Sequence, residues 1–123
     1  MIIIDGVTYD VPVIAIRREA PILDRSAERT EDGILHRSVI GTYYNYYIEW
    51  ASISRTDEYA ALHNVLTSPV EFHVVTVPGT SGTYTFTAYI SSVKDELMKI
   101  HNGTNYWHKL SASFIAHDPA RTP

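Results

Sequence analysis

Residues 39–53 read VIGTYYNYYIEWASI, which is the clearest strand pattern in the chain. β-branched and aromatic side chains in strict alternation over this length are typical of a long strand that buries one face. The even positions would form the buried face, namely Ile40, Thr42, Tyr44, Tyr46, Ile48 and Trp50. The other face carries Tyr43 and Tyr47, whose rings combine apolar area with a polar tip and therefore favour contact with another protein.

One helix is predicted directly after this strand, over residues 56–67. Thr56 can cap its N-terminus, and the two acidic residues that follow place negative charge where the helix dipole favours it. Pro69 ends the helix soon after. The apolar stripe that would pack on a sheet consists of Tyr59, Leu62 and Leu66.

Strands are predicted for most of the remaining C-terminal half. Residues 70–77 and 83–93 flank a turn rich in glycine and proline, which indicates a β-hairpin. Residues 94–100 could form a helical turn, and the Asn-Gly pair that follows marks a tight turn. The last strand is expected over residues 106–116, with Leu110, Ala112 and Phe114 facing inward.

The N-terminus predicts a small hairpin, because Asp5-Gly6 separates two short apolar segments. The returning strand alternates over residues 7–13. It contains Pro12, which has no N–H to donate to a neighbouring strand, so we expect this strand at the edge of a sheet.

Residues 17–37 differ from the rest of the chain, because they hold ten of its 24 charged residues, five of each sign. The stretch has little periodicity, and we expect a long extended loop or arm. A loop of this length within a compact domain is usually functional. Balanced charge favours contact with a complementary surface over attraction to a polyanion. The alternative is a solvated, mobile loop with no partner.

The composition describes one globular domain over residues 1–123, with 45% apolar and 20% charged residues. The absence of cysteine excludes disulfides, Cys-ligated zinc and iron–sulfur clusters. A net charge of −4 argues against sequence-specific nucleic-acid binding. No apolar run is long enough to span a membrane, and the N-terminus does not resemble a signal peptide. The order of elements predicts a mainly β fold: an antiparallel β-sandwich or partly closed barrel with one flanking α-helix and a long charged loop.

The sequence gives little support for enzymatic chemistry. The six histidines have neither the i, i+4 spacing of a zincin nor an H-x-H strand pair, and scattered surface or half-buried positions are expected for them. Glu71 and His73 are the best metal candidates, since they would share one face of a strand. The chain has no nucleophile elbow, no phosphate-binding glycine loop and no dinucleotide fingerprint. We therefore expect a non-enzymatic protein without a cofactor or metal.

Aromatic side chains leave a second function open, that of a small ligand- or carbohydrate-binding β-module. Rings of this kind can stack on sugars or bases. The residues that keep this alternative open are Tyr43, Tyr47, Tyr89, Tyr106 and Trp107.

Four segments together resemble small structural proteins from the tail modules of bacteriophages and prophages. They read ERTEDGILHRSVIGTYYNY, TDEYAALHNVLTSPVEFHVVTVP, YTFTAYISSVKDEL and NYWHKLSASFIAHDPAR, and they cover nearly the whole chain. The resemblance implies the tail-tube type of fold, a β-sandwich with one flanking helix and a long loop that reaches a neighbouring subunit. Tail-tube, distal-tail and tail-terminator proteins assemble as rings, often hexameric, and the resemblance carries no catalytic residues.

The leading hypothesis is thus a virion tail protein, made in the bacterial cytoplasm, that self-associates into rings and contacts other tail proteins. A closed ring of head-to-tail contacts needs two different patches on each subunit. The charged segment and the second face of the 39–53 strand are the candidates for those patches. The expected interface residues are Ile22, Leu23, Arg25, Arg29, Ile34, Leu35, Tyr43 and Tyr47.

Overall fold

The computed structural model describes residues 2–51 and 56–123. These residues form a mainly β structure with one flanking helix, as the sequence predicts. Residues 52 and 53, the end of the predicted 39–53 strand, lie outside the described part. The elements are, in order, β1 (Ile3–Ile4), β2 (Val7–Thr8), β3 (Val13–Glu19), β4 (Ile22–Arg29), β5 (Leu35–Thr42), β6 (Asn45–Trp50), α1 (Thr56–Leu66), β7 (His73–Pro78), β8 (Thr83–His101) and β9 (Thr104–Ala116).

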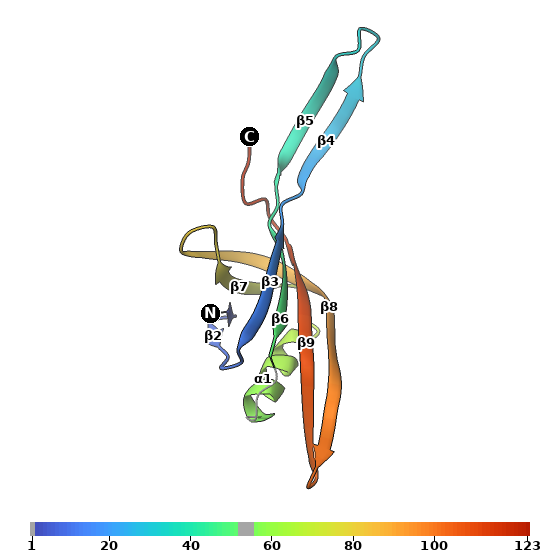
Figure 1. Cartoon of the computed structure of the whole chain (residues 1–123). Helices are drawn as coiled ribbons and strands as arrows, with labels where there is room; N and C mark the ends of the chain where they lie inside the picture. Colours follow the sequence, from blue (N-terminus) through green and yellow to red (C-terminus); the bar gives the residue numbers. More distant parts are fainter. Residues whose placement is uncertain (1, 52–55) are drawn as a thin grey trace.

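Seven strands form one sheet in the order β2-β1-β7-β8-β9-β6-β3, and every neighbouring pair is antiparallel. β3, β6 and β9 run along the length of the molecule, whereas β7 and the first part of β8 run across it (Figure 1). The pairing of β8 with β9 shifts register between Ile90 and Ser92. Such a bulge bends a strand and increases its twist, which lets the sheet curl around the core.

The core lies between this sheet and α1. The helix buries Tyr59, Leu62 and Leu66, the stripe that the sequence predicts. From the sheet, β6 and β9 contribute the side chains expected to face inward, namely Tyr46, Ile48, Trp50, Leu110, Ala112 and Phe114. The rings of Trp50 and Phe114 meet edge to face with their centroids 6.5 Å apart. The buried stripe of the helix and the inward side chains of the last strand are therefore confirmed. The even face of the 39–53 strand is confirmed only for Tyr46, Ile48 and Trp50, because Ile40 is 38% exposed and Thr42 and Tyr44 are only partly buried.

The charged segment 17–37 is not a loop, so this prediction is wrong. It contains the end of β3, all of β4, a turn and the start of β5. β4 and β5 form a second, two-stranded antiparallel sheet that projects beyond the large sheet (Figure 1). An alternating pattern of apolar residues does not mark these strands in the sequence. Both of their faces are exposed, so neither face needs to be apolar.

Two other expectations about strands need correction. The 39–53 strand is not continuous, because β5 ends at Thr42 and β6 begins at Asn45. The two halves belong to different sheets, and the buried face changes between them: β5 exposes Ile40 and buries Gly41, whereas β6 buries the even positions. Residues 94–100 form no helical turn but continue β8, which is 19 residues long. They pair with β9 as part of a ladder of 11 residue pairs. The local propensity of residues 94–100 could not predict this pairing with a distant strand.

The tight turns occur where the sequence places them. Asp5 and Gly6 have φ values of 51° and 82° between β1 and β2, and Asn102 and Gly103 have values of 50° and 75° between β8 and β9. Positive φ at both central positions gives the hairpin turn that Asp-Gly and Asn-Gly favour. The strand after the first turn is shorter than predicted, since β2 ends at Thr8. β2 lies at one edge of the large sheet, as predicted, and β3, which follows Pro12, lies at the other edge.

No described helix is long and apolar enough to cross a membrane.

Candidate interaction surfaces

The first surface is the β4–β5 hairpin, residues 22–42, here called the arm. Its most exposed aliphatic side chains are between 46% and 56% exposed: Ile22 and Leu23 lie at the root, and Ile34 and Leu35 lie at the tip. A two-stranded hairpin without a packed face is marginally stable in water. These exposed aliphatic side chains at both ends of the arm leave apolar area that another macromolecule could cover.

Two of the three arginines on the arm have partners within it. The Arg37 Nε lies 2.6 Å from the Asp24 carboxylate, across the two strands. Arg29 donates from Nη1 to the Gly33 carbonyl at 2.7 Å and so closes the turn. Arg25 is exposed at a register shift in β4, and it has no ion-pair or hydrogen-bond partner within residues 2–51 and 56–123. One guanidinium on the arm is thus open to a partner.

The turn of the arm is fixed by Asp32. Its carboxylate accepts hydrogen bonds from the Thr30 hydroxyl and from the Ile34 N–H. Because both bonds favour the charged form, they lower the pKa of Asp32. Gly33 follows with a φ of 82°, which an L side chain adopts only with strain.

The root of the arm is fastened to the body by backbone contacts. The Tyr43 N–H donates to the Pro21 carbonyl at 2.9 Å, and the Thr42 N–H donates to the Arg121 carbonyl at 2.8 Å. Gly41 lies where the C-terminal segment crosses the root, and a Cβ there would come within 2.6 Å of the Arg121 carbonyl oxygen. The arm therefore leaves the body in a defined direction.

The structure gathers six of the eight expected interface residues on the arm. Tyr43 lies just after the root and packs partly against the core. Tyr47 lies on β6, within the large sheet, beneath the Arg17 guanidinium at 5.3 Å from the ring centroid. These two tyrosines therefore do not extend the apolar surface of the arm.

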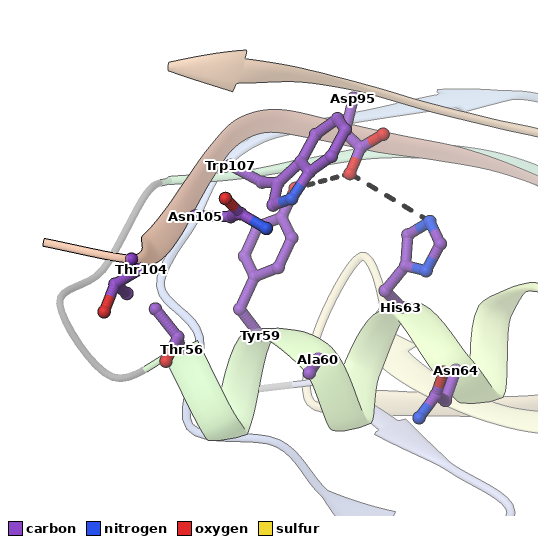
Figure 2. A pocket seen from close by; sticks show the side chains of 10 residues that line it. Thr56, Tyr59, Ala60, His63, Asn64, Asp95, Thr104, Asn105 and Trp107 are labelled. Atoms are coloured by element: carbon purple, nitrogen blue, oxygen red, sulfur yellow. Dashed lines mark hydrogen bonds and ion pairs between the residues drawn. The ribbon is translucent and has the colours of Figure 1, made fainter. Parts of the chain in front are cut away.

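The second surface is a cleft between α1 and the far end of the β8–β9 hairpin, here called the groove. It has a volume of about 550 Å³. Side chains from three elements converge on it in Figure 2. Its lining consists of Thr56, Tyr59, Ala60, His63, Asn64, Asp95, Gly103, Thr104, Asn105 and Trp107.

Asp95 is the central polar group of the groove. The Tyr59 hydroxyl donates to its Oδ2 at 3.0 Å, and the His63 Nε2 lies 4.0 Å from the same oxygen (Figure 2). Burial, this hydrogen bond and the nearby negative charge together raise the pKa of Tyr59 well above its ordinary value. Tyr59 thus remains a neutral donor, and the contacts that Asp95 makes within residues 2–51 and 56–123 engage its Oδ2.

A bulge in the β8–β9 ladder positions Asp95. The register shifts between Lys94 and Glu96, so that Lys109 and Leu110 together lie opposite Asp95. Lys109 adopts a φ of 56°, a rare conformation for a residue with a side chain. Bulges of this kind re-aim side chains. Asp95 is here only 18% exposed and reaches the helix.

Apolar side chains continue the groove toward the tip of the hairpin. They are between 41% and 66% exposed, and they are Leu97, Ile100 and Trp107. Sequence reasoning missed this surface, because a helical turn over residues 94–100 would have scattered these side chains. Trp107 was the one signal for it. The other aromatic residues proposed for ligand binding lie elsewhere: Tyr106, for example, packs under Lys99 on β8, 5.0 Å from the ring centroid.

The expected pairing of Glu71 with His73 on one strand face is not formed. β7 begins only at His73, so Glu71 precedes the strand. His73 is buried, contrary to the expectation of surface or half-buried histidines. Its Nδ1 lies 2.6 Å from the Asp5 carboxylate and its Nε2 lies 3.4 Å from the Ser68 hydroxyl. Both ring nitrogens are thus occupied by contacts between elements.

Asp5 holds β1 against β7 through this contact. Burial alone would raise its pKa, but hydrogen bonds from His73 and from the Val74 N–H lower the pKa below its ordinary value. Within residues 2–51 and 56–123, no group of three or more His, Asp or Glu side chains is arranged to hold a metal ion. Comparison of the chain with protein-family models, curated protein sequences and solved structures finds no match.

Proposed function

We propose that this protein is a non-enzymatic structural subunit that self-associates through its arm into rings. The resemblance of the sequence to phage and prophage tail modules supports a place in a virion tail, as a tail-tube, distal-tail or tail-completion component. In that setting its partners are further copies of the chain and other tail proteins. The polar contacts described above fit a structural role, since His73 and Asp5 join two strands.

The observation that carries the proposal is the arm itself. Four large aliphatic side chains lie exposed on a hairpin that backbone hydrogen bonds fasten to the body at its root. Burying one such side chain contributes about 1.5–3 kcal/mol, whereas an exposed ion pair contributes about 0–1 kcal/mol. The aliphatic side chains should therefore dominate the association, and the arm's charges should set its specificity.

Replacing Ile22 and Leu23 with serine tests this proposal. Because both side chains are exposed, we expect the monomer to unfold as the wild type does, while self-association is lost. Light scattering and sedimentation at high protein concentration measure the species above 13.9 kDa. The matched control replaces Val70 and Val74, two exposed valines on the body, with serine. A wild-type protein that stays monomeric, or an arm variant that still assembles, would contradict the proposal.

The groove favours a second candidate function, that of a small ligand- or carbohydrate-binding module. Trp107 offers an exposed aromatic face beside the polar side chains of Asn105 and Asp95. Titration with simple sugars, followed by tryptophan fluorescence, tests it. Binding should change the emission of the wild type but not of the Trp107→Phe variant, because Trp50 is buried in the core.

A further inference from the structure

The arm projects from one end of the molecule, and α1 and the tip of the β8–β9 hairpin, which border the groove, lie toward the other end (Figure 1). We infer that the groove of one copy receives the arm of a second copy, with Arg25 of the arm paired with Asp95 of the groove. This inference rests on the proposed self-association and names the acceptor for the arm.

On the donor side, the choice of Arg25 follows from the contacts of the arm. Arg37 pairs with Asp24, and Arg29 is held by the Gly33 carbonyl. Arg25 remains exposed at the bulge of β4, without a partner in the described part of the chain. A bulge directs its side chain away from the regular ladder, so the guanidinium can reach another molecule.

On the acceptor side, Asp95 is a carboxylate in surroundings that suit a guanidinium. None of the ten described residues that line the groove is a lysine or an arginine. The aromatic rings of Tyr59 and Trp107 lie beside the carboxylate (Figure 2). A guanidinium is planar and weakly hydrated, and it stacks on aromatic faces while it donates to a carboxylate. Charge complementarity thus selects an arginine-bearing segment.

The apolar parts of the two surfaces also match. On the arm, Ile22 and Leu23 precede Arg25 at the root, whereas Ile34 and Leu35 lie at the tip; the groove continues into Leu97, Ile100 and Trp107. A contact centred on Arg25 and Asp95 would cover the exposed side chains nearest to each, Leu23 on the arm and Trp107 on the hairpin. A charged pair from which the surrounding contacts exclude water contributes more to binding than a pair at an exposed rim.

The positions of the two surfaces determine what such contacts build. Because the arm and the groove are different patches at opposite ends, one copy can use its arm while its groove receives another. Heterologous contacts of this kind propagate, and they close only if the rotation between copies allows it. We therefore assign this contact to head-to-tail association, which forms a ring where the rotation between copies closes it.

A charge exchange tests the pairing. Arg25→Asp and Asp95→Arg should each weaken association about tenfold or more, because each places like charges together. The two variants mixed, or the double variant alone, should restore it. Glu96→Arg is the matched control, since Glu96 neighbours Asp95 on β8 but contacts Lys109 and His108 outside the groove. It should assemble as the wild type does.

The failures of this inference and of the proposed function are distinguishable. If Asp95→Arg assembles normally while the Ile22→Ser/Leu23→Ser variant does not, the arm binds elsewhere and this inference is wrong. Loss of association in both single variants without restoration in the double variant also contradicts a direct pair. A wild type that never associates overturns both proposals.

Cysteine crosslinking separates head-to-tail association from a symmetric dimer. The chain has no cysteine, so Arg25→Cys/Asn105→Cys introduces the two reactive thiols without background. Oxidation of the assembled double variant should give a ladder of covalent multimers on a denaturing gel. A covalent dimer without higher species would show a closed, reciprocal contact and would overturn head-to-tail association.

Discussion

Two hairpins project from this molecule, and they are held in different ways. The arm is a sheet of its own, joined to the body only at its root. The distal part of the β8–β9 hairpin, residues 94–109, continues two strands of the core, and α1 lies beside one of its faces. Both carry exposed aliphatic side chains, yet only the second is continuous with buried structure.

A hairpin that projects from the body therefore does not always unfold independently of it. Strand continuity couples the distal hairpin to the cooperative unfolding of the core. The arm has few contacts outside its own two strands, so it should open without the body. The four predictions below use this contrast.

The largest difference is expected between the bases of the two hairpins. Leu110 is fully buried where β9 leaves the core, so Leu110→Ala should lower the free energy of unfolding by about 2–5 kcal/mol. Leu23 lies exposed at the base of the arm, and Leu23→Ala should change the free energy of unfolding by about 0.5 kcal/mol or less. Urea unfolding of dilute, monomeric protein measures both. Equal losses would show that the arm is part of the core.

The root of the arm gives the next effect. Gly41→Ala would place a Cβ 2.7 Å from the Pro119 Cβ and still closer to the Arg121 carbonyl oxygen. Relieving that overlap should cost about 1–3 kcal/mol of unfolding free energy, because the C-terminal segment must shift. Gly79→Ala is the control, since its Cβ would meet no atom closer than 3.5 Å. Thermal unfolding that does not separate the two variants would contradict the described root.

Hydrogen exchange should separate the hairpins in the unmodified protein. Amides of β4 and β5 should exchange about tenfold faster than those of residues 94–109, and amides of the β6–β9 ladder should be the most protected. The comparison is made on dilute protein by mass spectrometry. At high concentration the arm should become protected if it binds another copy. Equal protection of the amides of both hairpins at low concentration would show that the arm does not open independently of the body.

The smallest effect concerns two carboxylates with lowered pKa values, Asp5 in the body and Asp32 in the arm. A carboxyl whose pKa is lower when folded adds stability that is complete above its ordinary value of 3.8 and is lost as pH falls through the folded value. The wild type should therefore exceed Asp5→Asn in stability at pH 5, and the gap should shrink toward pH 2. Acid unfolding of Asp32→Asn should follow the wild type, because the arm opens separately.

Much of the body could be predicted from single residues and local spacing. The helix over residues 56–67, the Asp-Gly and Asn-Gly turns and the inward faces of β6 and β9 all follow from short-range rules. These rules succeed where an element buries one face, because the apolar residues then recur with a period of 2 in a strand or 3.6 in a helix. The apolar residues of the arm could likewise be recognised as candidates for an interface.

The tertiary structure decided what has no local signature. The arm is a hairpin because residues 22–29 pair with residues 35–42. Neither of its exposed faces carries a periodic pattern of apolar residues that would predict this pairing. Asp95 and Tyr59 are 36 residues apart, and a bulge at Lys109 with a rare backbone conformation brings them together. The sequence by itself determined which faces could be buried. Only the pairing of distant strands decided which exposed faces were left to form the arm and the groove.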